Sequence, residues 1–147
     1  MMRYEDRFWT SQDGLKLHYR EYPAHEQLGG GDTQQSESAL ERPSTSVRPP
    51  IICLPGLTRN AHDFEALAEQ VSPEWRVLCL EMRGRGDSEY ARDANTYNPA
   101  QYAQDVTALL DALEIERFVA IGTSLGGLIT MLLALQAPDR IAGAVIN

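Results

Sequence analysis

The sequence predicts an α/β protein built on a doubly wound, mostly parallel sheet. Two observations predict this class. Strand-like and helix-like segments alternate from residue 51 to residue 147, and such alternation is typical of right-handed crossovers that feed a parallel sheet. The apolar run at 51–54 is continuous, as expected for a strand buried on both faces. A chain of 147 residues, 43% of them hydrophobic, suits a single domain with its own core.

The chain begins with an expected antiparallel hairpin. The segment "LKLHYREY" follows Gly14 and alternates apolar with polar residues, so we expect it to pair with the preceding "RFWTS". His18 lies on this hairpin and His25 just beyond it, and both are expected to face solvent. Residues 24–50 are rich in Gly, Ser, Gln, Glu, Thr and Pro. This composition predicts a flexible insert inside one domain that spans residues 1–147.

The residues after the insert carry three helix patterns separated by strand patterns. The first helix has apolar residues at i, i+3, i+4 and i+7, namely Phe64, Leu67, Ala68 and Val71. The segment "WRVLCLEM" then predicts a strand. After the second helix, "RFVAIG" predicts a strand, residues 125–136 a largely buried helix, and "IAGAVIN" the start of one more strand.

The second helix, at 98–113, has the clearest signals. Asn98 can cap it and Pro99 suits its first position. Its apolar residues form one stripe, made of Tyr102, Val106, Leu109, Leu110 and Leu113. Asp105 and Asp111 lie off this stripe, so they are expected on a solvated face.

The composition narrows the possible partners and the compartment. The net charge of -8 argues against binding to nucleic acid or to an anionic membrane. The N-terminus lacks the apolar core of a secretory signal and no apolar run is long enough to span a bilayer, so we expect a cytoplasmic protein. Cys53 and Cys79 lie in apolar strand patterns, as small buried residues do. We therefore expect no metal and no disulfide. We also expect no cofactor, and a small molecule as substrate.

Gly122, Ser124 and Gly126 form the pattern G-x-S-x-G directly between a predicted strand and a predicted helix. A serine on such a sharp turn has strained backbone angles, and its neighbours must be small so that strand and helix can approach each other. The turn also places the serine oxygen at a helix N-terminus, where free N–H groups stabilise developing negative charge. This context favours Ser124 as a nucleophile over an ordinary helix start.

The segments "LPGLTRNAHDFEALA", "EMRGRGDSEYA" and "IGTSLGG" occur in that order, and with them the chain resembles the first half of an α/β-hydrolase of the single-domain esterase and carbon–carbon hydrolase type. The resemblance covers nearly the whole chain outside the insert. It implies Ser124 as nucleophile, with the backbone N–H groups of Leu57 and Leu125 as the oxyanion hole. It also implies an ester, thioester or related carbonyl bond as the target.

The chain departs from this family pattern at two positions. Relatives often have His-Gly where this chain has Pro55 and Gly56, so the backbone donor is kept and any role of a histidine side chain is lost. Relatives tend to have Asp in place of Glu81, in a turn that looks structural. Epoxide hydrolases and haloalkane dehalogenases of the family use an aspartate nucleophile, so Ser124 argues against both activities.

The sequence offers no good base for Ser124. The resemblance implies an acid and then a histidine after the sixth strand, yet all three histidines precede Ser124. His62 is the only one expected near the catalytic edge, and it would need both hydrogen-bond reach to the serine and an orienting partner. Asp139 follows the helix that begins at the nucleophile, so we expect it at the opposite edge of the sheet.

The simplest interpretation is a hydrolase truncated after about the sixth strand, with little activity of its own. We expect its exposed sheet edge to cause aggregation or self-association. Two alternatives remain open. The first is that the chain is a non-catalytic α/β-hydrolase-like binding module. The second is that a partner chain supplies the missing acid and histidine.

Overall fold

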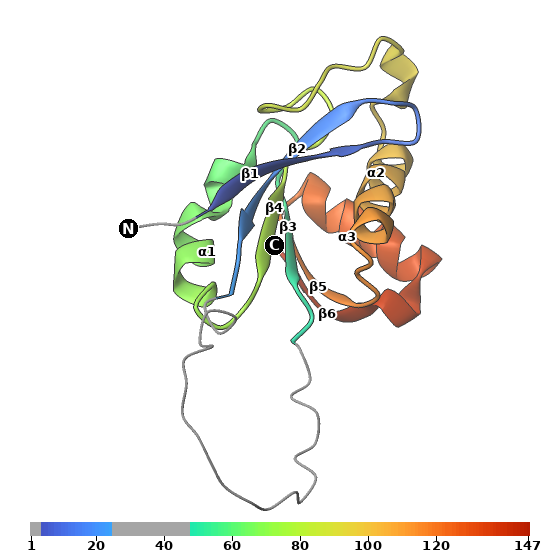
Figure 1. Ribbon diagram of the computed structural model, residues 1–147. Helices are drawn as coiled ribbons and strands as arrows, with labels where there is room; N and C mark the ends of the chain where they lie inside the picture. Colours follow the sequence, from blue (N-terminus) through green and yellow to red (C-terminus); the bar gives the residue numbers. More distant parts are fainter. Residues whose placement is uncertain (1–3, 25–47) are drawn as a thin grey trace, which may run out of the picture.

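The structure is a computed structural model that describes residues 4–24 and 48–147 (Figure 1). The elements in chain order are β1 (Glu5–Thr10), β2 (Lys16–Tyr22), β3 (Ile51–Leu54), the 3-10 helix η2 (Ala61–Phe64), α1 (Glu65–Val71), β4 (Val77–Leu80), η3 (Ala94–Thr96), α2 (Pro99–Ala112), β5 (Phe118–Gly122), α3 (Leu125–Gln136), η4 (Pro138–Arg140) and β6 (Ile141–Ile146). Most of the predicted insert at 24–50, including His25, lies outside the described residues.

The described residues form a six-stranded sheet in the order β1-β2-β4-β3-β5-β6. β1 pairs antiparallel with β2, and β2 pairs antiparallel with β4. The pairs β3–β4, β3–β5 and β5–β6 are parallel. The predicted fold class, a mostly parallel sheet with an antiparallel opening hairpin, is therefore confirmed. The carboxyl ends of the parallel strands meet at one edge, where ligands bind in sheets of this kind.

Helices cover both faces of the sheet (Figure 1). α1 lies on one face, and α2 and α3 lie together on the other. Apolar residues of α1 pack with one core cluster, which includes Phe64, Ala68 and Cys79. The larger core cluster lies under α2 and α3 and includes Leu54 and Ile129. Cys53 and Cys79 are buried free thiols on neighbouring strands.

α2 forms as its capping signals predict. The side-chain oxygen of Asn98 accepts the N–H of Gln101 at 2.8 Å, and Pro99 opens the helix. Most of the predicted apolar stripe is buried, with Leu113 only partly buried against the core. Because the cap satisfies an otherwise free N–H group, the helix begins at the residue that the sequence indicates.

Asp105 was expected to face solvent, and this prediction is wrong. The residue is 1% exposed and accepts two hydrogen bonds of 2.8 Å from Arg83, a side chain that is 0% exposed. The same guanidinium also reaches Asp13 in the hairpin turn, at 2.9 Å and 3.0 Å. Hydrogen bonds from Arg83 and Ser11 lower the pKa of Asp13 to about 2. A buried cation therefore draws Asp105 inward and joins α2 to the hairpin.

His18, on the hairpin strand β2, was expected to face solvent, and this too is wrong. β2 lies between β1 and β4, and His18 and Glu21 on it are buried. Glu21 receives Arg7 from β1 and Arg76 from the segment before β4. Polar residues of this strand are inside because charged partners from other segments meet them there.

The predicted burial of α3 holds for one side of the helix only. Gly126, Ile129 and Leu133 are buried, whereas Leu128 and Leu135 are exposed. β6 forms one edge of the sheet within the described part of the chain, and its side chains Val145 and Ile146 are also exposed. Among residues 4–24 and 48–147, no helix is both long and apolar enough to cross a bilayer.

The Arg83–Asp105 pair gives a stability prediction. We expect Asp105→Ala to lower the free energy of unfolding by roughly 3–5 kcal/mol, because Arg83 keeps its charge in a buried place without its main partner. Urea unfolding followed by tryptophan fluorescence measures this loss. The matched control is Asp111→Ala, which removes an exposed partner of Arg140 and should cost less than about 1 kcal/mol. Equal losses in the two variants would contradict the structural role of Asp105.

The apolar edge strand gives a second prediction. We expect the chain to self-associate through β6, and Val145→Lys to shift it towards monomer, because a lysine on an edge strand opposes pairing with another edge. Sedimentation velocity over a concentration series measures the shift. Gln70→Lys adds the same charge at an exposed residue of α1 and should leave the distribution as in the unmodified chain. Unchanged association in Val145→Lys would place the contact elsewhere.

Candidate active site

Ser124 lies on a sharp turn between the end of β5 and the start of α3. Its backbone angles are φ 52 and ψ -112, outside the small left-handed region open to residues with a side chain. The only other non-glycine residue of the described chain with positive φ is Glu114. The Ser124 carbonyl accepts the N–H groups of Gly127 and Leu128 at 2.9 Å and 3.2 Å, which starts the helix, and the side chain is exposed.

Two glycines allow this turn to pack closely. A Cβ atom at Gly126 would overlap the carbonyl oxygen of Leu54 at the end of β3, and one at Gly122 would overlap the carbonyl oxygen of Gly126. A third glycine, Gly127, lies against Ile146 of β6, because an added Cβ would come within 2.8 Å of that side chain. The first turn of α3 is thus pressed onto three neighbouring parallel strands.

The loop after β3 lies beside Ser124. A Cβ at Gly56 would be 3.9 Å from the Cβ of Ser124. Residues 56–59 form a turn in which the N–H of Arg59 reaches the carbonyl of Gly56 at 3.1 Å. In the described parts of the chain, the N–H groups of Leu57 and Leu125 donate no hydrogen bond. The N–H groups of Leu57 and Leu125, the predicted oxyanion donors, therefore lie close to Ser124 and have no partner among residues 4–24 and 48–147.

His18 is enclosed, which corrects the expectation that it faces solvent. Its side chain is 2% exposed, with Nδ1 2.5 Å from Glu81 and Nε2 2.8 Å from Asp6. Burial alone would lower the pKa of His18, but the hydrogen bonds to Glu81 and Asp6 outweigh it and raise the pKa. Both ring nitrogens have carboxylate partners, so His18 is not free to act as a base for Ser124.

Glu81 holds two loops at the carboxyl edge of the sheet. Its carboxylate accepts the N–H of Ala61 at 3.1 Å and the N–H of Asp87 at 2.9 Å, besides the contact with His18. Burial would raise the pKa of Glu81, but these hydrogen bonds outweigh it and lower the pKa. The contacts of Glu81 are therefore with the hairpin and the two loops.

His62 is a weak candidate for the base of Ser124, as the sequence indicated. It is exposed in η2, and its Nδ1 lies 2.8 Å from Glu65. Within the described residues it makes no hydrogen bond to Ser124. Asp139 lies in η4, directly before β6, whose first residue pairs with Phe118 at the start of β5. It is therefore at the opposite end of the strands from Ser124, as expected.

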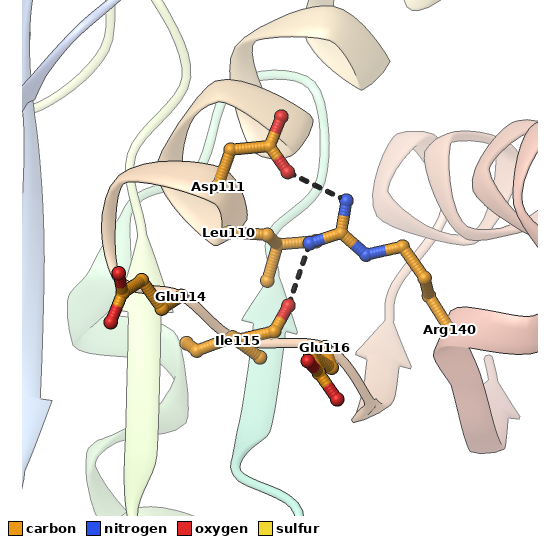
Figure 2. A pocket seen from close by; sticks show the side chains of 6 residues that line it. All are labelled: Leu110, Asp111, Glu114, Ile115, Glu116 and Arg140. Atoms are coloured by element: carbon orange, nitrogen blue, oxygen red, sulfur yellow. Dashed lines mark hydrogen bonds and ion pairs between the residues drawn. The ribbon is translucent and has the colours of Figure 1, made fainter.

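Two cavities lie at opposite ends of the parallel strands, and only one of them is near Ser124. One of about 460 Å³ adjoins the turn at 56–59, and its lining residues are Leu57, Thr58, Arg59, Asn60, Gly84, Arg85 and Gly86. Figure 2 shows another, of about 630 Å³, where Arg140 donates to Asp111 and to the carbonyl of Ile115. This second cavity lies at the amino ends of β5 and β6, away from Ser124, so only the first one adjoins the candidate site.

Sequence reasoning did not single out Arg85 as a site residue. Its guanidinium lines the smaller cavity and donates to the carbonyl of Leu57 at 2.9 Å. The available signal was its place in the loop directly after a buried strand, at the edge where ligands bind. Its partner, the Leu57 carbonyl, could not be inferred from spacing because the two residues are on different loops.

Comparison with known proteins identifies relatives of the chain. A model of the alpha/beta hydrolase fold family matches residues 49–147. The crystal structure of an alpha/beta hydrolase from Novosphingobium aromaticivorans is 58% identical, with a TM-score of 0.82 over 100% of this chain and 45% of that one. A 3-hydroxybutyrate-oligomer hydrolase of Cupriavidus necator is 43% identical over 84 residues, 57% of this chain and 29% of the relative.

A further relative is named for a different reaction. A 2-heptyl-3-hydroxy-4-quinolone dioxygenase of Rhodococcus erythropolis is 31% identical over 104 residues, 70% of this chain and 37% of the relative. The chain spans less than half the length of each of these three proteins. The family match over residues 49–147, with the mixed sheet and the strand–turn–helix at Ser124, shows that the chain belongs to the α/β-hydrolase family.

Proposed function

We propose that this chain carries the nucleophile and the oxyanion hole of a serine hydrolase that cleaves an ester, thioester or related carbonyl bond. The observation that carries the proposal is the backbone of Ser124, held at φ 52 with its side chain exposed. Such strain costs about 1–3 kcal/mol and concentrates at functional sites. The unpaired N–H groups of Leu57 and Leu125 beside the serine support the same function.

In the proposed reaction, Oγ of Ser124 attacks the substrate carbonyl carbon and its proton passes to a general base. The carbonyl oxygen becomes an oxyanion that accepts hydrogen bonds from Leu57 and Leu125, and the N-terminus of α3 adds its positive dipole end. The intermediate collapses to an acyl-serine ester while the protonated leaving group departs. Water then cleaves this ester, which releases the acid and restores the Ser124 hydroxyl.

We further propose that the base and its orienting acid do not come from residues 4–24 and 48–147. His18 is held between two carboxylates, and His62 pairs with Glu65. The relatives extend well beyond the matched region, since the chain spans 29% of one and 45% of another. We expect only residual hydrolysis from residues 1–147 alone, because a serine hydrolase without its full triad retains roughly 10³-fold catalysis over water.

A relative named for the hydrolysis of 3-hydroxybutyrate oligomers makes oligomers of hydroxy acids the first substrates to test. The alternative of a non-catalytic binding module is less well supported. A binding module gains nothing from a strained serine with two unpaired N–H groups beside it, whereas a nucleophile needs both.

The nucleophile is tested by covalent labelling. We expect a fluorophosphonate probe to modify the chain slowly, because no base activates the serine, and mass spectrometry to place the adduct on Ser124. Ser124→Ala should abolish the adduct. Ser72→Ala is the control, since this serine lies at the C-terminal end of α1 and its loss should leave the labelling rate unchanged. Labelling that persists in Ser124→Ala would contradict the proposed nucleophile.

The close packing of the turn gives a separate prediction. We expect Gly126→Ala to slow the labelling of Ser124 at least about tenfold, because α3 must move away from Leu54 and misplace the serine. The overlap should also lower the free energy of unfolding by roughly 1–3 kcal/mol. In Gly143→Ala the added Cβ meets no atom within 4 Å, so this control should label as the unmodified chain does. A normal labelling rate in Gly126→Ala would show that the turn tolerates the shift.

A further inference from the structure

The turn at 56–59 determines where the N–H of Leu57 points. The carbonyl of Gly56 accepts the N–H of Arg59 at 3.1 Å, and the described chain has no cis peptide bond. A trans peptide unit is planar, so the N–H of Leu57 points away from that carbonyl, on the opposite side of the same unit. The direction of the proposed oxyanion donor is therefore fixed by how the turn is held.

The middle peptide of such a turn has two possible orientations. The carbonyl of the second residue points in opposite directions in type I and type II turns. The type II turn requires positive φ at the third residue. The third residue here is Thr58, which does not have positive φ. A β-branched residue is strained at positive φ, so Thr58 disfavours the type II orientation of the middle peptide.

Arg85 fixes this middle peptide directly. Its Nε donates to the carbonyl of Leu57 at 2.9 Å. The guanidinium is itself anchored, because a second nitrogen donates to the carbonyl of Arg83 and to the hydroxyl of Tyr102, both at 3.0 Å. It also lies 5.0 Å from the ring centroid of Tyr102 and 5.9 Å from that of Tyr97.

The anchors of Arg85 belong to the rigid part of the molecule. Arg83 is fully buried and Tyr102 is a buried residue of α2 in the main core. Leu57, in contrast, is 58% exposed. An exposed loop that needs a fixed orientation is therefore tied to the core through one half-buried side chain.

We propose that Arg85 is a positioning residue for the oxyanion hole. By holding the Leu57 carbonyl it restrains the exposed turn at 56–59, and with it the adjoining 56–57 peptide whose N–H is the proposed donor beside Ser124. The inference rests on the proposed function of these two residues. An arginine suits the role because its planar fork donates to Leu57 and Tyr102 at the same time, which the single ammonium of a lysine does not reproduce.

The first test measures the loop itself and needs no catalysis. In the chain labelled with ¹⁵N, we expect the Leu57 amide to have an order parameter near about 0.85, and to fall below about 0.6 in Arg85→Met. Tyr102→Phe removes one anchor and should give an intermediate value. Arg117→Met removes an exposed arginine at the far end of β5 and should leave Leu57 rigid.

The second test measures the residual hydrolysis of p-nitrophenyl acetate. Removing an oxyanion donor costs about 10²–10³ in kcat, so loosening one should lower kcat about tenfold with KM within about twofold. Arg85→Lys should behave as Arg85→Met does, and Arg117→Met as the unmodified chain. Urea unfolding of each variant shows whether it remains folded under the assay conditions. A reduced kcat in a variant that is still folded reflects loss of positioning and not loss of stability.

The outcomes distinguish this inference from the proposed function. A rigid Leu57 amide and an unchanged kcat in folded Arg85→Met would overturn the inference. A raised KM with unchanged kcat would also overturn it, because Arg85 would then contact substrate instead of the loop. Equal hydrolysis by the unmodified chain and by Ser124→Ala would overturn the proposed function, while the mobility of Leu57 would still decide the role of Arg85.

Discussion

The contact between the first turn of α3 and the end of β3 is the constraint on which the candidate site depends. Gly126 approaches the carbonyl of Leu54 so closely that no side chain fits between them. Because the helix is pressed onto the sheet there, the chain must turn sharply after β5, and Ser124 takes backbone angles that a residue with a side chain avoids. Packing against the core over-determines the strained turn and leaves the serine hydroxyl exposed at the carboxyl edge of the sheet.

Two buried ionic clusters hold the loops around this turn. Arg83 joins the hairpin turn to α2 through Asp13 and Asp105. The carboxylate of Glu81 meets His18 from the hairpin and the N–H groups that flank the smaller cavity. Buried charges of this kind add little stability when compared with apolar packing, but their directional hydrogen bonds fix one arrangement of the loops. The hairpin therefore helps to position the loops at the carboxyl edge of the parallel strands, although it contributes no strand end to that edge.

Much of the fold could be predicted because its signals are local. The apolar run at 51–54 and the cap at Asn98 act on neighbouring residues of the chain. Gly122 and Gly126 are recognised by their spacing from Ser124, although the Leu54 carbonyl that Gly126 meets is distant in sequence. The burial of His18 and Asp105 could not be predicted in this way. Their exposure depends on Glu81 and Arg83, which are distant in sequence and are brought near only by the completed sheet. Hydrophobic periodicity predicts the face of a helix or strand on which a residue lies. It does not predict the charged partner that makes burial of a polar residue favourable.

The loop after β4 shows how one buried carboxylate affects a more distant group. A Cβ at Gly86 would overlap the carboxylate of Glu81, so the observed position of this carboxylate requires a glycine at residue 86. The loop consequently wraps around Glu81, with the N–H of Asp87 bound to it. Arg85, the residue before this glycine, is thereby held within reach of the Leu57 carbonyl. Because Asp is one methylene shorter than Glu, Glu81→Asp would pull the loop inward or lose the hydrogen bond from Asp87. The length of the acidic side chain at this position is therefore linked, through Gly86 and Arg85, to the placement of the loop that carries the proposed oxyanion donor.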